Sequence, residues 1–182
     1  MNYASIKNCD IANGPGVRVS LFVSGCTHHC KGCFNQIAWD FDYGQAFTQD
    51  TVDEILNMLS PTYIKGLTVL GGEPFEPRNQ AAVVDLLRQV KHKYPDKSIW
   101  VFTGFLLDKD ILSGKIGDPD VVKEYLSYLD VLVDGPFIEE KKDLMLRFRG
   151  SSNQRLIDVQ ATLNSDEIVL WRDAQIHDRG KI

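Results

Sequence analysis

The chain has 182 residues, of which 43% are hydrophobic and 25% charged, and its formal net charge is −5, from 20 Lys plus Arg against 25 Asp plus Glu. This apolar share supports a buried core, which argues against wholesale disorder, and the length predicts a single domain over residues 1–182. The acidic balance argues against a nucleic-acid partner. No run approaches the about 18 apolar residues of a membrane span. The first residues lack the apolar core of a secretory signal, so we expect a cytoplasmic protein with no membrane partner.

Strand-like and helix-like patterns alternate along the chain. Short β-branched or apolar runs closed by glycine-containing turns predict strands at 18–23, 67–70, 98–102 and 131–133. Apolar stripes at helical spacing predict helices at 51–59, 79–94 and 121–129. This alternation favours a mainly parallel sheet with right-handed crossovers. A closed eight-fold βα barrel needs about 200 residues or more, so the predicted fold is α/β, an incomplete and open βα barrel.

The last third of the chain is more basic and has weaker patterns. Residues 144–148 and 156–159 read as strands that flank a loop at 150–154. The basic residues in 141–155 most simply form a solvated face, with a docking surface for a partner as the alternative. Residues 160–182 contain no motif, and their structure stays open at this point.

A cluster of three cysteines offers the first chemical signal. Cys26, Cys30 and Cys33 have C-x3-C-x2-C spacing, and Cys9 stands alone upstream as a free thiol. Disulfides are disfavoured in a reducing cytosol, and the short loops here gain little from a crosslink. A zinc site needs four ligands, and the fourth would be Cys9 or one of the two histidines at 28 and 29.

Three thiolates on one loop also suit a cubane iron–sulfur cluster. Four irons with three cysteines leave one iron open, and an open metal position is where a substrate or cofactor binds. The histidines at 28 and 29 are expected near the cluster rather than on it, and Trp39 is expected in the core.

Four segments follow the predicted strands: the cysteine loop (residues 25–35), 71–74, 103–104 and 134–135. In parallel α/β sheets the active groups gather at the carboxyl ends of the strands, so we expect these segments to share one rim. The cysteine motif after the first of these strands, with Gly-Gly-Glu-Pro after the second, resembles the radical S-adenosylmethionine superfamily. The segments NGPGVR at 13–18, VLVDGP at 131–136 and RGSSNQ at 149–154 resemble, more narrowly, the activating proteins of anaerobic (class III) ribonucleoside-triphosphate reductase. The resemblance extends to about Val159.

The resemblance implies that Cys26, Cys30 and Cys33 hold a catalytic [4Fe-4S] cluster whose fourth iron is chelated by S-adenosylmethionine. It also implies that the glycine-rich turn of Gly71, Gly72 and Glu73 receives the methionyl amino group.

Many members of the superfamily carry an aromatic residue before the third cysteine, where this chain has Gly32. The backbone from Gly32 through Cys33 to the neighbouring Phe34 is therefore expected to meet the adenine. Thr103 and Asp134 are expected to face the ribose or the methionine carboxylate, or else to cap turns.

The implied activity is that of an oxidoreductase that stores a glycyl radical on the large subunit of the reductase. An external one-electron donor, flavodoxin-like or similar, would be a second partner. Two alternatives stay open: a radical enzyme acting on another glycyl-radical protein or on a small molecule, and a zinc-bound interaction module without catalysis.

Overall fold

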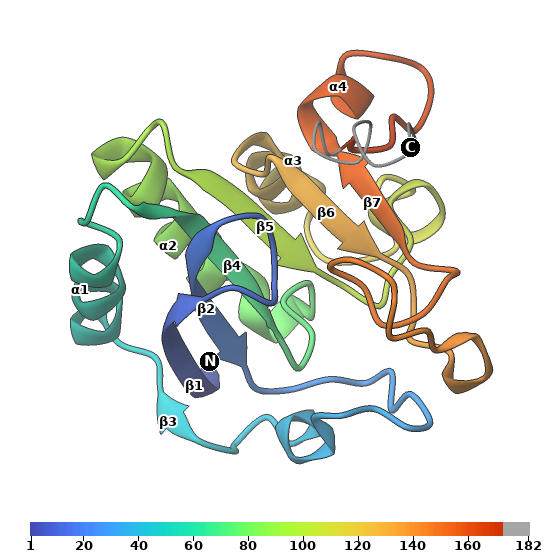
Figure 1. The fold of residues 1–182 in the computed structure, drawn as a ribbon, viewed down its shortest axis with the longest axis horizontal. Helices are drawn as coiled ribbons and strands as arrows, with labels where there is room; N and C mark the ends of the chain where they lie inside the picture. Colours follow the sequence, from blue (N-terminus) through green and yellow to red (C-terminus); the bar gives the residue numbers. More distant parts are fainter. Residues whose placement is uncertain (173–182) are drawn as a thin grey trace, which may run out of the picture.

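The computed structural model describes residues 1–172, and its central feature is a seven-stranded sheet in the order β3, β1, β2, β4, β5, β6, β7 (Figure 1). The four inner strands run parallel: β2 (Val17–Val23), β4 (Ile64–Gly71), β5 (Ser98–Phe102) and β6 (Val131–Asp134). Antiparallel strands complete both edges: β1 (Asn2–Asp10), β3 (Gln45–Ala46) and β7 (Arg155–Asp158). The open, mainly parallel α/β architecture predicted from the sequence is confirmed.

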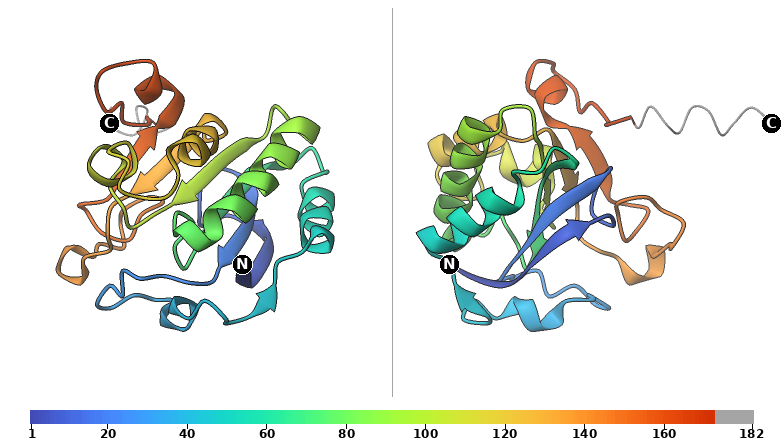
Figure 2. Two further views of the ribbon diagram at one scale, coloured as in Figure 1. Left: turned by 180° about the vertical axis from the view of Figure 1, so that it is seen from behind. Right: turned by 60° about the vertical axis from the view of Figure 1, so that its left-hand side comes forward.

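Three helices cover the outer face of the sheet (Figure 2). They are α1 (Gln49–Met58), α2 (Pro77–Lys93) and α3 (Pro119–Ser127). Proline in the first turn starts α2 and α3, because its fixed φ suits a helix and its missing N–H is not needed there. The side chain of Asp118 also caps α3 by accepting from the backbone N–H groups of Asp120 and Val121. The helix patterns predicted from the sequence therefore correspond to the crossovers between parallel strands.

The two faces of the sheet differ in what covers them. On the outer face, alternate residues of the strands pack with the helices in the main hydrophobic core. On the inner face, Trp100, Val131 and Val133 form a second cluster, against which Phe148 and Trp171 pack from outside the parallel strands. The inner face is thus the concave side of an incomplete barrel, and irregular segments rather than helices partly cover it.

Arg18 of β2 is fully buried on this inner side, where it lies over the ring of Trp100. Its Nε donates to Thr68 Oγ1 at 2.7 Å, and its Nη2 donates to the carbonyls of Leu67 and Ser98 at 2.8 and 2.9 Å. Burial lowers the pKa of Arg18 to about 10, so the guanidinium remains protonated at neutral pH. This cation joins β2, β4 and β5 at the end of the sheet where these strands begin.

The structure departs from the sequence expectations in the edge regions. The edge strands β1 and β3 were not predicted, and residues 144–148, predicted as a strand, form turns. The apolar side chains of Leu144, Met145 and Leu146 face the cavity or solvent, and that of Phe148 packs against the inner cluster, so this apolar run does not indicate a strand paired in the sheet. Of the open segment 160–182, the first residues belong to α4 (Val159–Leu163) and Leu170 bridges to Ile157, whereas 173–182 lie outside the described residues.

Within residues 1–172, none of the helices has the length and apolar character needed to cross a bilayer.

Close packing of β4 against β5 gives a test of the fold. A Cβ at Gly66 would lie 1.8 Å from the carbonyl oxygen of Ser98 on β5. We predict that Gly66→Ala lowers the free energy of unfolding by about 3 kcal/mol, because backbone must move to relieve the overlap. Anaerobic chemical denaturation measures the loss. Gly114→Ala, with no neighbour within 4 Å of the new Cβ but a positive φ of +74°, should cost about 1 kcal/mol and serves as control. Equal stability losses in the two variants would contradict the packing argument.

Candidate functional site

A cavity of about 440 Å³ lies at the carboxyl ends of the parallel strands. Its walls come from residues 12–13, the cysteine loop, 70–73, 102–104 and 135–154. All three clustered cysteines line it, and so does the Gly71–Glu73 turn. The expected shared rim is therefore present, and strand topology brings together segments that are far apart in the sequence.

The cysteine loop begins with a sharp reversal at the end of β2. Gly25 adopts φ +93°, and a Cβ there would lie 2.1 Å from the ring of Phe41. The N–H of Gly25 donates to the carbonyl of Ala38 at 2.8 Å, and that of Cys26 donates to the carbonyl of Trp39 at 3.1 Å. The chain thus folds back on itself, which fixes the start of the cysteine loop before the first thiol.

The Gly-Gly-Glu turn packs directly beneath the cysteine loop. Gly71 has φ +114°, and a Cβ at Gly72 would lie 2.5 Å from the carbonyl oxygen of Gly25 and 2.8 Å from that of Ala38. The N–H of Glu73 donates to the carbonyl of Gly25 at 2.8 Å. Both glycines are therefore needed for the close approach of two backbone segments, one bearing thiols and the other bearing a carboxylate.

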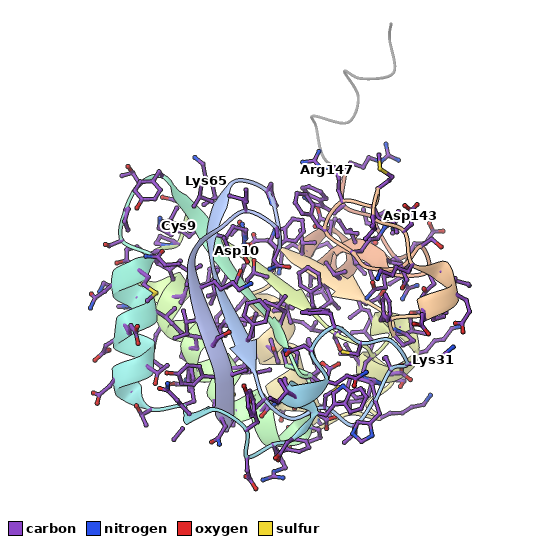
Figure 3. All side chains as sticks on the ribbon, turned by 60° about the horizontal axis from the view of Figure 1, so that its bottom comes forward. Cys9, Asp10, Lys31, Lys65, Asp143 and Arg147 are labelled. Atoms are coloured by element: carbon purple, nitrogen blue, oxygen red, sulfur yellow. The ribbon has the colours of Figure 1, made fainter. Side chains whose placement is uncertain are left out.

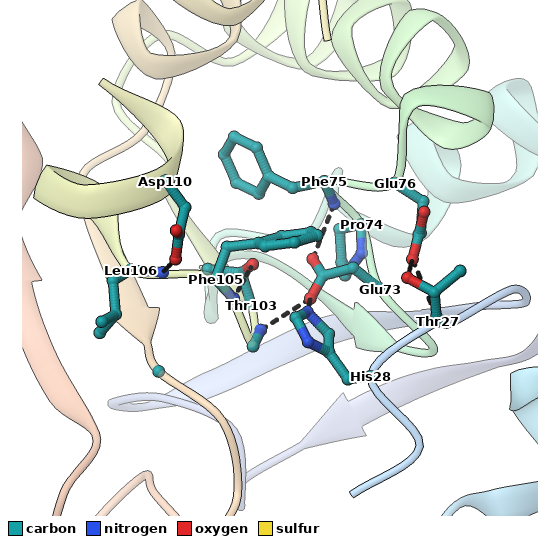
Figure 4. A network of polar contacts seen from close by, with 12 residues as sticks. Thr27, His28, Glu73, Pro74, Phe75, Glu76, Thr103, Phe105, Leu106 and Asp110 are labelled. Carbon is teal, nitrogen blue, oxygen red and sulfur yellow. Dashed lines mark hydrogen bonds and ion pairs between the residues drawn. The ribbon is translucent and has the colours of Figure 1, made fainter. Parts of the chain in front are cut away.

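The carboxylate of Glu73 joins three parts of the site (Figure 4). Its Oε1 accepts from the N–H of Phe75 at 2.8 Å, and its Oε2 accepts from the N–H of Gly104 at 2.6 Å. The same Oε2 lies 3.0 Å from Nε2 of His28 in the cysteine loop. Glu73 is only 1% exposed. Its side chain thus ties its own turn to the cysteine loop and to the end of β5.

A second carboxylate anchors the next residue of the loop. Oε1 of Glu76 accepts from both the N–H and the Oγ1 hydroxyl of Thr27, at 2.8 and 2.5 Å (Figure 4). Glu76 occupies the N-cap position of α2, so the loop is fastened to the helix end as well as to the sheet. Sequence reasoning did not identify the roles of Glu76 and Thr27; the only signal was the proximity of Glu76 to the Gly-Gly-Glu turn.

Neither loop histidine is positioned as a free ligand. His28 is bound to Glu73 and packs edge-on against Phe105 at 4.3 Å between ring centroids. Burial lowers the pKa of His28, but the hydrogen bond and charge of Glu73 outweigh it, and the net pKa lies above the ordinary value. His29 lies over the ring of Trp39, with centroids 4.7 Å apart. Trp39 itself lines the cavity rather than the core, so the expectation for that residue was wrong.

The predicted cofactor residues other than Asp134 line the cavity. Gly32, Cys33, Phe34 and Thr103 line the cavity, and Phe34 is 83% exposed at its rim. Gly32 has φ +72°, a backbone conformation that other residues rarely adopt, and a Cβ there would lie 2.7 Å from Oε1 of the half-exposed Glu139, so the backbone conformation favours glycine before the third cysteine. The hydroxyl of Thr103 accepts from the N–H of Phe105 at 3.1 Å, which is the turn-capping role that the sequence left open.

Asp134 is placed differently from the expectation that it faces the cofactor. It is fully buried, and its carboxylate accepts from Nε and Nη2 of Arg155 and from the N–H of Leu107. These contacts give Asp134 a structural role: they hold β7 to β6 and cap the single π-helical turn Leu107–Ile111. At this strand end the cavity is lined by Gly135 instead.

The donor set at the cavity consists of three cysteine thiols. All four cysteines are free thiols, and the three in the loop surround one cavity. Burial raises the pKa of Cys26 to about 12 and also raises that of Cys30, so ligation must displace protons from these thiols. Within residues 1–172, no three His, Cys, Asp or Glu side chains converge as they would around a single ion. Three soft donors spread around a cavity fit a larger cluster.

Comparisons with known proteins agree with this chemistry. Residues 12–157 match the model of the family described as "4Fe-4S single cluster domain". The chain is similar to the anaerobic ribonucleoside-triphosphate reductase-activating protein of Vibrio cholerae, at 46% identity over 85% of this chain and 96% of the relative. The proteins of the same name from Enterobacteria phage T4 and Escherichia coli K12 are 43% and 42% identical, over 86% and 85% of this chain and 93% and 96% of the relatives.

The contacts of Glu73 predict an unusual sensitivity to amide substitution. In Glu73→Gln, the new amide nitrogen would face the N–H of Phe75 in one orientation and the N–H of Gly104 in the other. One buried donor is then always unpaired, so we predict a loss of about 2–3 kcal/mol in the free energy of unfolding. We also predict at least a tenfold fall in cofactor cleavage, since misplacement of the loops by about 1 Å can cost as much as about 100-fold. Anaerobic denaturation and a cleavage assay measure the two effects.

Glu76→Gln is the matched control for this prediction. Both hydrogen bonds from Thr27 use Oε1, so the amide nitrogen can occupy the other position without facing a donor. Its effect should remain below about 1 kcal/mol. Comparable losses in the two variants would contradict the bridging role of Glu73.

Proposed function

Because the chain belongs to the family of anaerobic ribonucleoside-triphosphate reductase-activating proteins, we propose that it forms a glycyl radical on the large subunit of that reductase. The observation that carries the proposal is the single cavity on which the three cysteines and the Gly-Gly-Glu turn converge. When bound, a [4Fe-4S] cluster with S-adenosylmethionine supplies one-electron reductive cleavage of a carbon–sulfur bond and removal of a glycine hydrogen.

The residues of the chain divide this task among them. Cys26, Cys30 and Cys33 would hold the cluster with their thiolates and leave one metal position for the cofactor. The Gly71–Glu73 turn would lie along the methionyl part, because its two glycines leave backbone carbonyls accessible where a side chain would obstruct them. Gly32, Cys33 and Phe34 would present their backbone to the adenine, and Thr103, which lines the same cavity, would meet the ribose.

The walls of the site protect reactive chemistry while leaving an entrance. Glu73 and Glu76 hold the cysteine loop in place from behind, so that loop movement does not admit water from that side. The incomplete barrel leaves the rim beside Phe34 open to solvent. A protein segment carrying a glycine can enter there, whereas a closed barrel would admit only small molecules. An external one-electron donor, flavodoxin-like or similar, would serve as reductant, and a cytoplasmic location suits that chemistry.

The proposal is tested by anaerobic reconstitution with iron and sulfide, reduction with S-adenosylmethionine present, and addition of the cognate reductase. We expect an oxygen-sensitive visible absorption, release of 5′-deoxyadenosine and a glycyl radical signal in electron paramagnetic resonance. Cleavage without a radical on the reductase would favour action on another glycyl-radical protein or a small molecule. A colourless, air-stable protein with zinc would overturn the proposal.

The ligand assignment makes a separate prediction. Replacing any one of Cys26, Cys30 or Cys33 by Ala should lower bound iron and abolish release of 5′-deoxyadenosine, because the cluster loses one of three anchors. Cys9→Ala should leave both quantities close to those of the unmodified protein, since Cys9 is exposed on β1 and does not line the cavity. Iron analysis and product quantification check this, and a Cys30→Ala protein that retains cleavage would refute the assignment.

A further inference from the structure

One structural element beside the cavity is not used by the proposed chemistry. We call it the mouth loop, residues 142–151, and it is closed at its base by a bridge between Lys142 and Ser151. The N–H of Asp143 also donates to the carbonyl of Gly150 at 3.3 Å. The loop contributes much of the outer wall of the cavity. The mouth loop therefore lies where a protein that approaches the cavity would contact it.

The RGSSNQ motif fixes this loop to the end of β6. Oε1 of Gln154 accepts from the N–H groups of Gly150 and Ser151 at 2.9 and 3.1 Å, and its Nε2 donates to the carbonyl of Gly135 at 3.1 Å. Nδ2 of Asn153 donates to the carbonyl of Pro136 at 2.8 Å. The motif therefore works as a brace that holds the mouth loop beside the cavity, so the loop is presented in a defined shape.

The segment before the mouth loop is joined to the cysteine loop. Nζ of Lys31 lies 3.1 Å from a carboxylate oxygen of Glu139 and 3.2 Å from one of Glu140. Figure 3 shows Lys31, Asp143 and Arg147 on the right-hand side of the view, away from Cys9. The two loops thus frame the cavity together.

The outer surface of the cysteine loop and the mouth loop carries large apolar side chains that do not pack into the core. Leu144 and Met145 at the tip of the mouth loop are 87% and 88% exposed, and Phe34 on the cysteine loop is 83% exposed. Leu144 and Phe34 both line the cavity, so the apolar surface is continuous with the site. Large apolar side chains grouped at a rim are typical of a surface that a partner covers.

The charge around the apolar tip restricts the kind of partner. The mouth loop contains one acidic residue, Asp143, and three basic residues, Lys142, Arg147 and Arg149, in a chain of net charge −5. The side chains of Lys142 and Arg147 are exposed beside the tip. A second copy of this chain packed symmetrically would bring the same cations together, which is unfavourable. A partner that covers the tip therefore needs an apolar pocket bordered by carboxylates.

We propose that the mouth loop is the docking surface for the reductase subunit that carries the target glycine, and that Met145 enters an apolar pocket edged by acidic residues. This rests on the proposed function. The docked tip lies beside the entrance, so binding there places the partner's glycine segment at the cavity.

The proposal is tested with cluster-loaded protein and purified cognate reductase, mixed anaerobically, by measuring the dissociation constant of the complex. Met145→Glu should raise the dissociation constant at least tenfold, because it places a carboxylate in an apolar, acid-bordered pocket. Cleavage of S-adenosylmethionine driven by a chemical reductant without the reductase should not change, because Met145 does not line the cavity. Leu112→Glu is the control, because Leu112 is 49% exposed and lines a separate hollow beside α3. The dissociation constant of the Leu112→Glu variant for the reductase should stay within twofold of that of the unmodified protein.

Four outcomes would overturn the proposal. The first is a Met145→Glu dissociation constant within twofold of the unmodified protein, and the second is an equal weakening by Leu112→Glu. The third is a self-associated chain that Met145→Glu converts to monomer without loss of reductase binding, which would assign the tip to a second copy. If the unmodified protein neither binds the reductase nor forms the radical, the proposed function fails and the docking surface fails with it; normal radical formation with unchanged Met145→Glu binding removes the docking surface alone.

Two matched variants test whether the partner's pocket has an acidic border. Lys142→Glu and Lys123→Glu alter the net charge equally, but only Lys142 lies on the mouth loop, and Lys123 is exposed on α3. We expect Lys142→Glu to weaken binding at least fivefold more than Lys123→Glu at low salt, with a smaller difference at high salt because of screening. Equal effects of the two variants would contradict an acidic border on the partner's pocket.

Discussion

A buried carboxylate beneath the cysteine loop is the constraint on which the site depends. Glu73 accepts hydrogen bonds from the backbone at Phe75 and Gly104 and contacts His28, so one side chain sets the distances among three segments that share no sequence proximity. A charged acceptor in a buried position has few alternative partners, and leaving it unpaired is costly. These contacts hold the base of the cysteine loop against the sheet through bonds of the folded chain itself. This is preorganisation of the kind that a redox site needs in order to hold a reactive cofactor in one orientation.

The open barrel makes this preorganisation compatible with a protein substrate. Parallel strands bring their carboxyl ends to one rim, while the antiparallel β1 and β7 flank the parallel strands without closing the barrel. Arg18 joins the opposite end of the inner face, so the sheet is stabilised where no substrate enters. The sheet is thus stabilised at one end of its parallel strands, while the substrate has access at the other end.

The sequence predicts the parts of this fold whose signals are local. The helices and parallel strands have strong apolar periodicity, and the cysteine spacing indicates the cluster directly. The edge strand β1 has weak alternation because Tyr3 is its one buried residue, and its pairing depends on β2 and β3. Residues 144–148 are rich in apolar side chains as a strand is, yet most of these side chains face the cavity or solvent, and Phe148 packs against the inner cluster around Trp100. The hydrophobic pattern alone does not distinguish these cases, because it does not reveal which surface the side chains pack against.

The structural role of Asp134, one of the two that the sequence left open, has a related physical cause. An acidic residue at the end of a parallel strand is a reasonable cofactor contact, but the nearest cation in space is Arg155, which follows 21 positions later on the neighbouring β7. Sequence distance conceals that pairing, and the bond satisfies the carboxylate before any ligand arrives. Gln154, the preceding residue, braces the mouth loop through Gly135, the residue after Asp134. Two consecutive residues of the RGSSNQR segment thus hold two consecutive residues of the Asp-Gly-Pro turn, one inside the sheet and one at the rim. The two sequence motifs VLVDGP and RGSSNQ therefore form a single structural unit. This unit fixes the position of the mouth loop relative to the thiols.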